Sequence, residues 1–416
     1  MSADLQPMAV ARGSLAAYAP VAGPEAVERL RAAAHPLRGA RVLHVTAARA
    51  GGRVPELLSA MLPLARDAGL EPDWRVLFGP ELEQVAPALQ DGMQGAESAL
   101  ADPDWSAYLD ACAQAARPLA DGFDLAVLHD PGVLGLAAAL ELPVVWRCHV
   151  DASRADPPLV ERVLPLVERC AVHAFPDPSF APEPLRERAL AAPPGIDPLN
   201  PRNLDPAPRL AGRVVRPLGV DLGHPFLCQV MRLDRWKDPH AALELLELAR
   251  DRVPDLQLVI AAGLDASDQD EWRAAKEVAD YGAERDGLHL LTSYEGVGNL
   301  ELGALQRLAR VSLQLSIREG FGLAASEALW KGTPVVGFRQ GGLPLQLRDG
   351  VDGYLADSVE QAAESVVELV SDPGLAIEMG RAGQERVRER FLVTRALGDE
   401  LRVLESALAG GTVNAG

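Results

Sequence analysis

The chain has 416 residues, of which 48% are apolar, and its 59 acidic and 40 basic residues give a formal net charge of -19. This length exceeds what one hydrophobic core usually organises, so we expect two globular domains. The negative charge argues against nucleic acid and anionic membranes as partners, and any site for an anionic ligand must be a local positive exception.

Cysteine usage and the N-terminus bear on the cellular compartment. The N-terminal residues 1–4 lack a basic start and an apolar export core, and the chain has no apolar run of about eighteen residues. Neither a CxxC pair nor a Cys/His metal spacing occurs among the four cysteines, which are Cys112, Cys148, Cys170 and Cys228. We therefore predict a reduced, cytoplasmic protein that does not span a membrane.

Short β-branched segments alternate with longer amphipathic ones in the first half of the chain. After about forty residues, we predict strands at 42–45, 125–128 and 143–146. The amphipathic segments that follow them lie at 55–68, 132–140 and 158–170. This βαβ rhythm predicts a parallel sheet whose ligands lie at the carboxyl ends of the strands.

A Pro-rich interval at 193–217 interrupts the rhythm and indicates a domain boundary. Strands are then predicted at 226–230, 256–262, 288–291, 311–315 and 335–336, and the chain is helical in pattern from 371 to about 408. We expect the tail at 410–416 to be frayed.

The rhythm predicts an α/β protein with two doubly wound, Rossmann-like parallel-sheet domains, at residues 1–207 and 208–385. We expect a C-terminal helix over 386–416 to pack back on the first domain. The cleft between two such domains is the expected site.

A glycine turn flanked by two carboxylates is the strongest local motif of the chain. Gly320-Phe321-Gly322 lies between a predicted strand and a predicted helix, whose free N–H groups suit a phosphate. Because an isolated GxG is usually only a tight turn, the flanking Glu319 and Glu327 carry the interpretation. At about 1.5 Å per helical residue they lie roughly 7 to 12 Å apart, the reach from a hexose to the ribose of its nucleotide. The two carboxyl groups of a retaining glycosidase lie about 5 Å apart, so this spacing argues against a retaining glycosidase pair. An inverting glycosidase pair stays possible.

Two cations precede this motif by about ninety residues. Arg232 and Lys237 lie in the loop between a predicted strand and a helix opened by Asp238-Pro239. Lys237 stands out because the chain has only three lysines. Fixed cations here would neutralise the charge that grows on a diphosphate leaving group. The alternative is an ordinary surface loop with ion pairs.

In the first domain, polar residues follow three predicted strands. Gly51-Gly52 allows a ligand to approach the backbone closely. Asp130 ends one strand and His149 ends the next. A single histidine at a strand end is more often structural, but two such ends near one cleft favour a functional role for both residues. His44 is interpreted as a core or supporting residue.

These residues together resemble the retaining glycosyltransferases of family 4, which have the GT-B architecture, and within that family the trehalose synthase group. The resemblance extends from 42 to about 391. The Glu-x7-Glu pattern is shared very widely, whereas WRCHVD and PPGIDPL narrow the resemblance to this group. The motifs are HDP at 129–131, WRCHVD at 146–151, PPGIDPLNPRN at 193–203, RLDRWKDP at 232–239, SIREGFGLAASEALWKGTPVVG at 316–337, GG at 341–342 and DGVDGYL at 349–355.

The resemblance implies a role for each matching residue. Arg232 and Lys237 would hold the donor diphosphate, and Glu319 would contact the transferred sugar. Glu327 would bind the ribose. The cradle for sugar and phosphate would be formed by Gly320, Phe321, Gly322, Leu323 and Ala324, together with Gly51 and Gly52. In the first domain, His149 would lie beside the anomeric carbon and Asp130 would hold the acceptor sugar.

The resemblance also implies the reaction. Glucose would pass from UDP-, ADP- or GDP-glucose to glucose with retention, giving α,α-trehalose, and the reaction would be reversible. The leaving phosphate oxygen would help to deprotonate the acceptor on the front face of the sugar. No metal and no further cofactor is expected, and a homodimer is implied. No motif specifies the base of the nucleotide.

One departure from the family pattern concerns the acceptor. The family usually has Gly-Gly-Gly-Val-Ala-Glu after the first strand, whereas this chain has Arg53 at the third position. Arg53 either pairs with a phosphate or changes which acceptor fits. Three alternatives therefore stay open: a trehalose phosphorylase that uses inorganic phosphate, a family 4 transferase with another sugar-like acceptor, and a catalytically silent sugar-nucleotide sensor.

Overall fold

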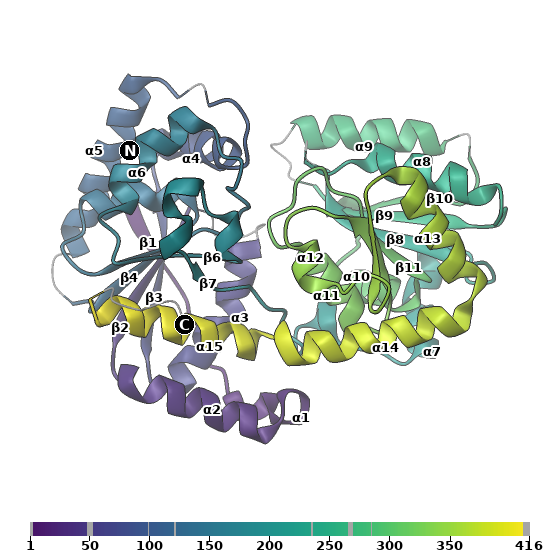
Figure 1. Cartoon of the computed structure of the whole chain (residues 1–416), viewed down its shortest axis with the longest axis horizontal. Helices are drawn as coiled ribbons and strands as arrows, with labels where there is room; N and C mark the ends of the chain where they lie inside the picture. Colours follow the sequence, from purple (N-terminus) through teal and green to yellow (C-terminus); the bar gives the residue numbers. More distant parts are fainter. Residues whose placement is uncertain are drawn as a thin grey trace. The chain divides into compact units, whose positions relative to one another are not determined.

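The computed structural model describes residues 3–47, 53–98, 100–119, 122–233, 236–264, 269–283 and 285–410. The chain forms two compact units (Figure 1). Unit 1 comprises Met1–Gly195 and Leu392–Gly416, and unit 2 comprises Ile196–Phe391. Each unit has a mainly parallel sheet with helices on both faces, so the expected fold class is confirmed.

The sheet of unit 1 has seven strands in the order β1-β3-β2-β4-β5-β6-β7. Only the edge pair β1–β3 is antiparallel, and the other described pairs are parallel. The strands are β1 (Asp4–Met8), β2 (Arg41–Thr46), β3 (Glu71–Phe78), β4 (Leu125–His129), β5 (Val144–Arg147), β6 (Val172–Phe175) and β7 (Leu190–Ala191). The central strands are almost wholly buried, as expected where helices cover both faces.

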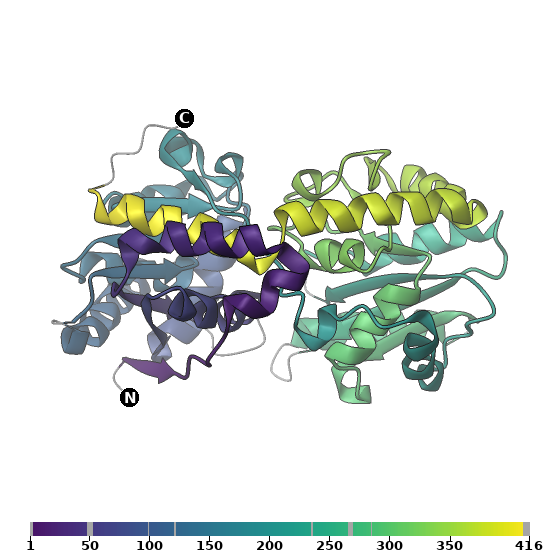
Figure 2. The ribbon, with the colours of Figure 1, turned by 90° about the horizontal axis from the view of Figure 1, so that it is seen from below.

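Helices far apart in the sequence cover one face of this sheet. They are α1 (Ala19–Ala22), α2 (Pro24–Ala34), α3 (Arg53–Asp67) and the C-terminal α15 (Val393–Leu408). Leu30, Leu58 and Leu397 join Val42 and Val127 of the strands in one apolar core. Figure 2 shows α2 and α15 side by side. The opposite face carries α4 (Pro80–Met93), α5 (Asp102–Ala116) and α6 (Pro157–Val167) (Figure 1).

The amphipathic segment predicted at 132–140 is a 3-10 helix, η4 (Pro131–Ala138), rather than an α-helix. Close packing against α5 explains the difference. A Cβ at Gly135 would come within 2.7 Å of the Tyr108 ring. The Tyr108 hydroxyl accepts a hydrogen bond from the Gly135 N–H and donates one to the Gly132 carbonyl, so the backbone of η4 is satisfied by a side chain.

The sheet of unit 2 has six parallel strands in the order β10-β9-β8-β11-β12-β13. They are β8 (Phe226–Arg232), β9 (Gln257–Gly263), β10 (Leu288–Thr292), β11 (Val311–Gln314), β12 (Val335–Phe338) and β13 (Gly353–Ala356). The helices are α7 (Pro208–Val215), α8 (Pro239–Arg250), α9 (Gln269–Gly282), α10 (Asn299–Leu308), α11 (Leu323–Trp330), α12 (Leu343–Gln346), α13 (Val359–Ser371) and α14 (Pro373–Arg390).

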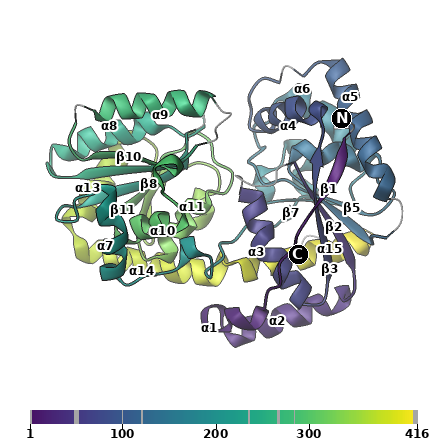
Figure 3. The same cartoon turned by 180° about the vertical axis from the view of Figure 1, so that it is seen from behind.

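Alternate residues of β8 belong to two different cores of unit 2. Leu227 and Met231 pack with α8, α9 and α13, whereas Cys228 and Val230 pack with α7 and α10. Figure 3 shows α8 and α9 on one side of this sheet and α7 and α10 on the other. The sheet is therefore doubly wound, and the carboxyl ends of its strands share one edge.

The last two helices of the chain belong to different units. α14 ends at Arg390 in unit 2, and α15 packs its apolar side within unit 1. None of the described helices combines the length and the hydropathy that a bilayer crossing needs. Residues 411–416, for which we predicted fraying, lie outside the described residues.

Candidate active site

Two loops of unit 2 bring Lys237 to Glu319. β8 and β11 are adjacent parallel strands, so the loops after them leave the same edge of the sheet. The Ile317 N–H donates to the Trp236 carbonyl at 3.0 Å, and Lys237 and Ser316 form an isolated antiparallel bridge. The paired backbones explain why residues 82 positions apart have side chains in contact.

The Glu319 carboxylate is held by three side chains. Its Oε2 forms an ion pair with the Lys237 ammonium, and accepts hydrogen bonds from Gln314 Nε2 at 2.8 Å and Ser316 Oγ at 3.3 Å. The Lys237 and Glu319 side chains are each 14% exposed. A partly dehydrated, hydrogen-bonded ion pair is stronger and better ordered than a surface pair. The cluster therefore offers both a fixed cation and a fixed acceptor.

Gln314 and Ser316 were not predicted as site residues. The signal that could have been used is a pair of polar residues two positions apart, one at the end of β11 and one just beyond it, whose side chains both reach Glu319. Their buried side chains leave no other evident reason for polarity in this strand.

The glycine turn has the geometry that the motif predicts. Gly322 has φ +80°, the left-handed region that favours glycine, and it precedes α11 as the N-cap. A Cβ there would lie 3.1 Å from Glu319 Cγ. The Gly342 N–H donates to the Gly320 carbonyl at 2.7 Å, and the Gln346 side chain donates to the Phe321 carbonyl. These two hydrogen bonds fix the backbone of the turn, and the first N–H groups of α11 follow directly after it.

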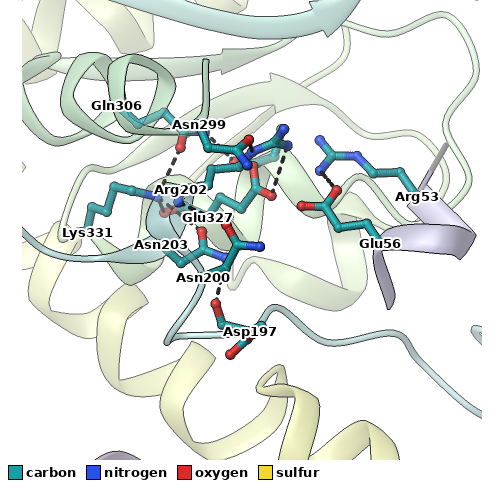
Figure 4. Close-up of polar contacts among 11 residues, drawn as sticks. Arg53, Glu56, Asp197, Asn200, Arg202, Asn203, Asn299, Gln306, Glu327 and Lys331 are labelled. Carbon is teal, nitrogen blue, oxygen red and sulfur yellow. Dashed lines mark hydrogen bonds and ion pairs between the residues drawn. The ribbon is translucent and has the colours of Figure 1, made fainter. Parts of the chain in front are cut away.

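Glu327 lies further along α11 in a buried polar cluster (Figure 4). Its Oε1 lies 3.5 Å from Arg202 Nη1, and its side chain is 2% exposed. Lys331 Nζ donates to the Glu327 carbonyl at 2.9 Å and to Gln306 Oε1 at 3.1 Å. Burial lowers the pKa of Lys331 to about 8, opposed mainly by the charge of Glu327. Arg202, from the PPGIDPLNPRN motif, was not predicted here.

The remaining cations lie at element ends. Arg232 is the last residue of β8 and is exposed. Arg53 is the first residue of α3, and its Nη1 forms an ion pair with Glu56 Oε2 at 3.2 Å, one turn further along (Figure 4). Gly51 and Gly52 lie outside the described residues.

In unit 1, the structure brings Asp130 and His149 together. Asp130 follows β4 with φ +67°, and among the described residues it is the only non-glycine with a positive φ. Its Oδ1 accepts the backbone N–H of His149 at 2.9 Å. Burial raises the pKa of Asp130 to about 6, opposed by this hydrogen bond and by Arg147. Such backbone strain in a residue with an altered pKa is typical of functional sites.

A buried ion pair joins β5, the strand that precedes His149, to the C-terminal helix α15. The Arg147 guanidinium, at the end of β5, pairs with the Glu400 carboxylate of α15, and the two side chains are 1% and 2% exposed. Arg147 Nη2 also donates to the Ala192 carbonyl at 3.3 Å. Burial lowers the pKa of Arg147 to about 10. The last helix therefore supplies the counter-ion that a buried guanidinium requires.

Comparisons with known proteins place both units in described families. The family model "Trehalose synthase, N-terminal domain" matches residues 44–182, and "Glycosyl transferases group 1" matches residues 214–386. A trehalose synthase of Rubrobacter xylanophilus is 36% identical over 409 residues, which cover 95% of this chain and 97% of that protein. A trehalose synthase of Pyrococcus horikoshii is 33% identical over 395 residues, which cover 94% of this chain and 95% of that protein.

Solved structures share the fold at lower identity. The structure of an α,α-trehalose 6-phosphate synthase from Burkholderia multivorans matches with a TM-score of 0.70 and 16% identity. The match covers 90% of this chain and 100% of the Burkholderia multivorans chain. At this identity the likeness establishes the fold alone.

Proposed function

The chain belongs to the trehalose synthase family of glycosyltransferases, and we propose that it is a retaining glucosyltransferase that forms α,α-trehalose from nucleoside-diphosphate glucose and glucose. Similarity to trehalose synthases over nearly the full length supports this choice. The observation that carries it is the Lys237–Glu319 pair beside the glycine turn of α11. A cation, a carboxylate and a helix N-terminus are what a sugar diphosphate requires.

Unit 2 is the donor half in this proposal. Arg232 and Lys237 hold the diphosphate, Glu319 accepts hydroxyl hydrogen bonds from the glucose, and Glu327 binds the ribose. Residues 320–324 supply the cradle, because their backbone passes through the glycine turn into the first turn of α11. The Arg202 contact supports the Glu327 assignment, since it holds the carboxylate in one orientation.

Unit 1 is the acceptor half. Asp130 holds the acceptor glucose and His149 lies beside the anomeric carbon. The hydrogen bond from the His149 N–H to Asp130 supports a joint role, because it fixes the two residues relative to each other. Arg53 adjusts the acceptor end of the site, whereas Gly51 and Gly52 belong to the cradle for the sugar and phosphate of the donor. From the family resemblance we further propose a cytoplasmic homodimer that requires no metal.

The reaction follows from the placement of charge. The bond between the anomeric carbon and the phosphate oxygen breaks, and the acceptor hydroxyl oxygen bonds to that carbon on the same face. The hydroxyl proton passes to the leaving phosphate oxygen. Lys237 and Arg232 accelerate this step because they stabilise the negative charge that grows on the diphosphate.

The proposal is tested with purified protein, UDP-, ADP- and GDP-glucose, and an acceptor panel of glucose, glucose 6-phosphate and glycerate. We expect a disaccharide with the mass of trehalose from glucose, with one nucleoside diphosphate released per product. A parallel reaction with trehalose and inorganic phosphate tests the phosphorylase alternative. Release of glucose 1-phosphate without nucleotide would overturn the proposal, and nucleotide binding without transfer to any acceptor would favour the sensor.

Acceptor binding should depend on pH through Asp130. The pKa of this carboxyl is raised to about 6, so the carboxylate forms as the pH rises through 6. A carboxylate accepts sugar hydroxyls better than the protonated acid, so KM for glucose should fall between pH 5 and 7. Asparagine tolerates the positive φ at this position. In Asp130→Asn the KM for glucose should be high and should not change with pH.

The control for Asp130→Asn is Asp110→Asn, at an exposed position of α5 in the same unit. Its KM profile should match that of the unmodified protein. A KM for glucose that is constant from pH 5 to 7, or unchanged in Asp130→Asn, would remove Asp130 from the acceptor site.

A further inference from the structure

Three histidines of unit 1 form a row across three adjacent strands. In the sheet register, His44 of β2 pairs with Val127 of β4, two residues before His129. His129 in turn pairs with Arg147 of β5, two residues before His149. Because alternate residues of a strand point to the same face, His44 and His129 project from one face of the sheet. His149 lies just beyond the end of β5, and its contact with His129 places its ring in the same row. From His44 to His129, and again from His129 to His149, the row shifts by two residues towards the carboxyl ends of the strands.

The three imidazoles are joined directly by their ring nitrogens. His44 Nδ1 lies 3.1 Å from His129 Nε2, and His129 Nδ1 lies 3.0 Å from His149 Nε2. Both pairs have ring centroids 5.4 Å apart, with planes inclined by 21° and 18°. Both distances are those of hydrogen bonds. His44 and His129 are 2% and 1% exposed, whereas His149 is half-buried.

Burial keeps the three rings neutral. It lowers the pKa of His44 to about 3 and the pKa values of His129 and His149 well below the ordinary range. The buried Arg147 guanidinium lowers all three further. A neutral imidazole has one N–H and one lone pair, so each contact needs one donor and one acceptor.

This requirement couples the three tautomers. If His44 Nδ1 carries a proton and donates, His129 Nε2 accepts, and the proton of His129 must be on Nδ1. His129 then donates to His149 Nε2, and the proton of His149 is on Nδ1. In the reverse arrangement every proton moves to the other nitrogen. Any mixture of the two places two N–H groups or two lone pairs against each other at hydrogen-bond distance.

We propose that His44 and His129 are positioning residues that fix the ring orientation of His149 and couple its tautomer to their own, and thereby influence whether its Nδ1 donates to or accepts from the sugar. The catalytic part of this inference rests on the role proposed for His149 beside the anomeric carbon. The coupling itself does not, because it follows from the contacts within unit 1. Two of the three histidines therefore act without touching the substrate.

The coupling is tested by NMR of the full chain labelled with 15N-histidine, in which the ring-nitrogen shifts report the tautomer. We expect matching tautomer populations at all three histidines in the unmodified protein and a different His149 population in His44→Leu, although residue 44 is separated from residue 149 by another ring. His44→Asn keeps a hydrogen-bonding amide near the position of Nδ1 and should return the His149 population towards that of the unmodified protein. The control is His173→Leu, a buried histidine of β6 that instead contacts the Leu185 carbonyl at 2.9 Å.

Activity measurements complete the test. We expect His44→Leu to lower kcat about tenfold, the size of effect known for partners that orient a functional histidine, with the donor KM changed less than kcat. His44→Asn should recover part of the loss, and His173→Leu should keep the unmodified kcat. An unchanged His149 tautomer in His44→Leu, or equal kcat values in His44→Leu and His173→Leu, would overturn the inference. An unmodified protein without transferase activity would instead refute the proposed function, and the NMR result would still test the coupling.

Discussion

Replacing Lys237 by alanine is expected to lower kcat about a hundredfold or more while the protein remains folded. The ammonium lies against the Glu319 carboxylate at the carboxyl ends of β8 and β11. In the proposed function it stabilises the charge that grows on the diphosphate towards the transition state. The loss should therefore affect kcat more than the KM of the donor. Glu319→Gln should also lower kcat well over tenfold, because it removes the charge that holds the lysine and that, in the proposed function, orients the sugar. Steady-state kinetics at saturating acceptor measure both effects.

The chain offers a matched control for Lys237→Ala. Lys276 is an exposed lysine of α9, paired with Asp280 one turn away, and Lys276→Ala should leave kcat and stability within error of the unmodified protein. Thermal unfolding of all three variants shows whether a loss of activity reflects a loss of fold. Rates close to those of the unmodified protein in both Lys237→Ala and Glu319→Gln would refute the donor site.

Replacing Glu400 by glutamine is expected to destabilise unit 1 by about 3–5 kcal/mol, the cost of leaving a buried charge without its partner. The Arg147 side chain is 1% exposed, so water cannot replace the carboxylate that α15 provides. The change is measured from urea unfolding followed by tryptophan fluorescence, with Trp146 adjacent to the altered pair. The loss should exceed that of any surface substitution.

Two further variants separate the charge effect from other causes. Glu405→Gln makes the same substitution at an exposed position of α15 and should change the free energy of unfolding by less than about 0.5 kcal/mol. Arg147→Leu combined with Glu400→Leu removes both charges and should recover most of the stability. If Glu400→Gln and Glu405→Gln unfold at the same urea concentration, the ion pair does not stabilise the docking of α15.

Much of the fold could be predicted from the sequence, because the central strands are short apolar runs between amphipathic helices. β2, β4, β5 and β8 all begin within one residue of their predicted positions. β3 was not predicted, because it begins with Glu-Pro-Asp, residues that disfavour strands. β1 was missed as well, since it is a strand only through its antiparallel pairing with β3 at the sheet edge.

The candidate site was predicted as motifs but not as contacts. The sequence places Lys237 and Glu319 after two strands, whereas their contact depends on β8 and β11 being neighbours although β9 and β10 intervene in the chain. The histidine row depends in the same way on the order β2-β4-β5. Arg147 and Glu400 are 253 residues apart, and neither has a local pattern that indicates the other. The substrate-binding roles of these residues stay predictions.

The reaction proposed for this site is transfer of glucose, with retention, to a second glucose. It is tested by the 1H and 13C NMR spectrum of the product formed from nucleoside-diphosphate glucose and an acceptor glucose labelled with 13C at C1. We predict a non-reducing disaccharide whose two anomeric protons both show the small coupling of an α linkage, with the label in one of the two rings. A β-anomeric proton in the transferred ring, or a product with a free reducing end, would rule out this reaction.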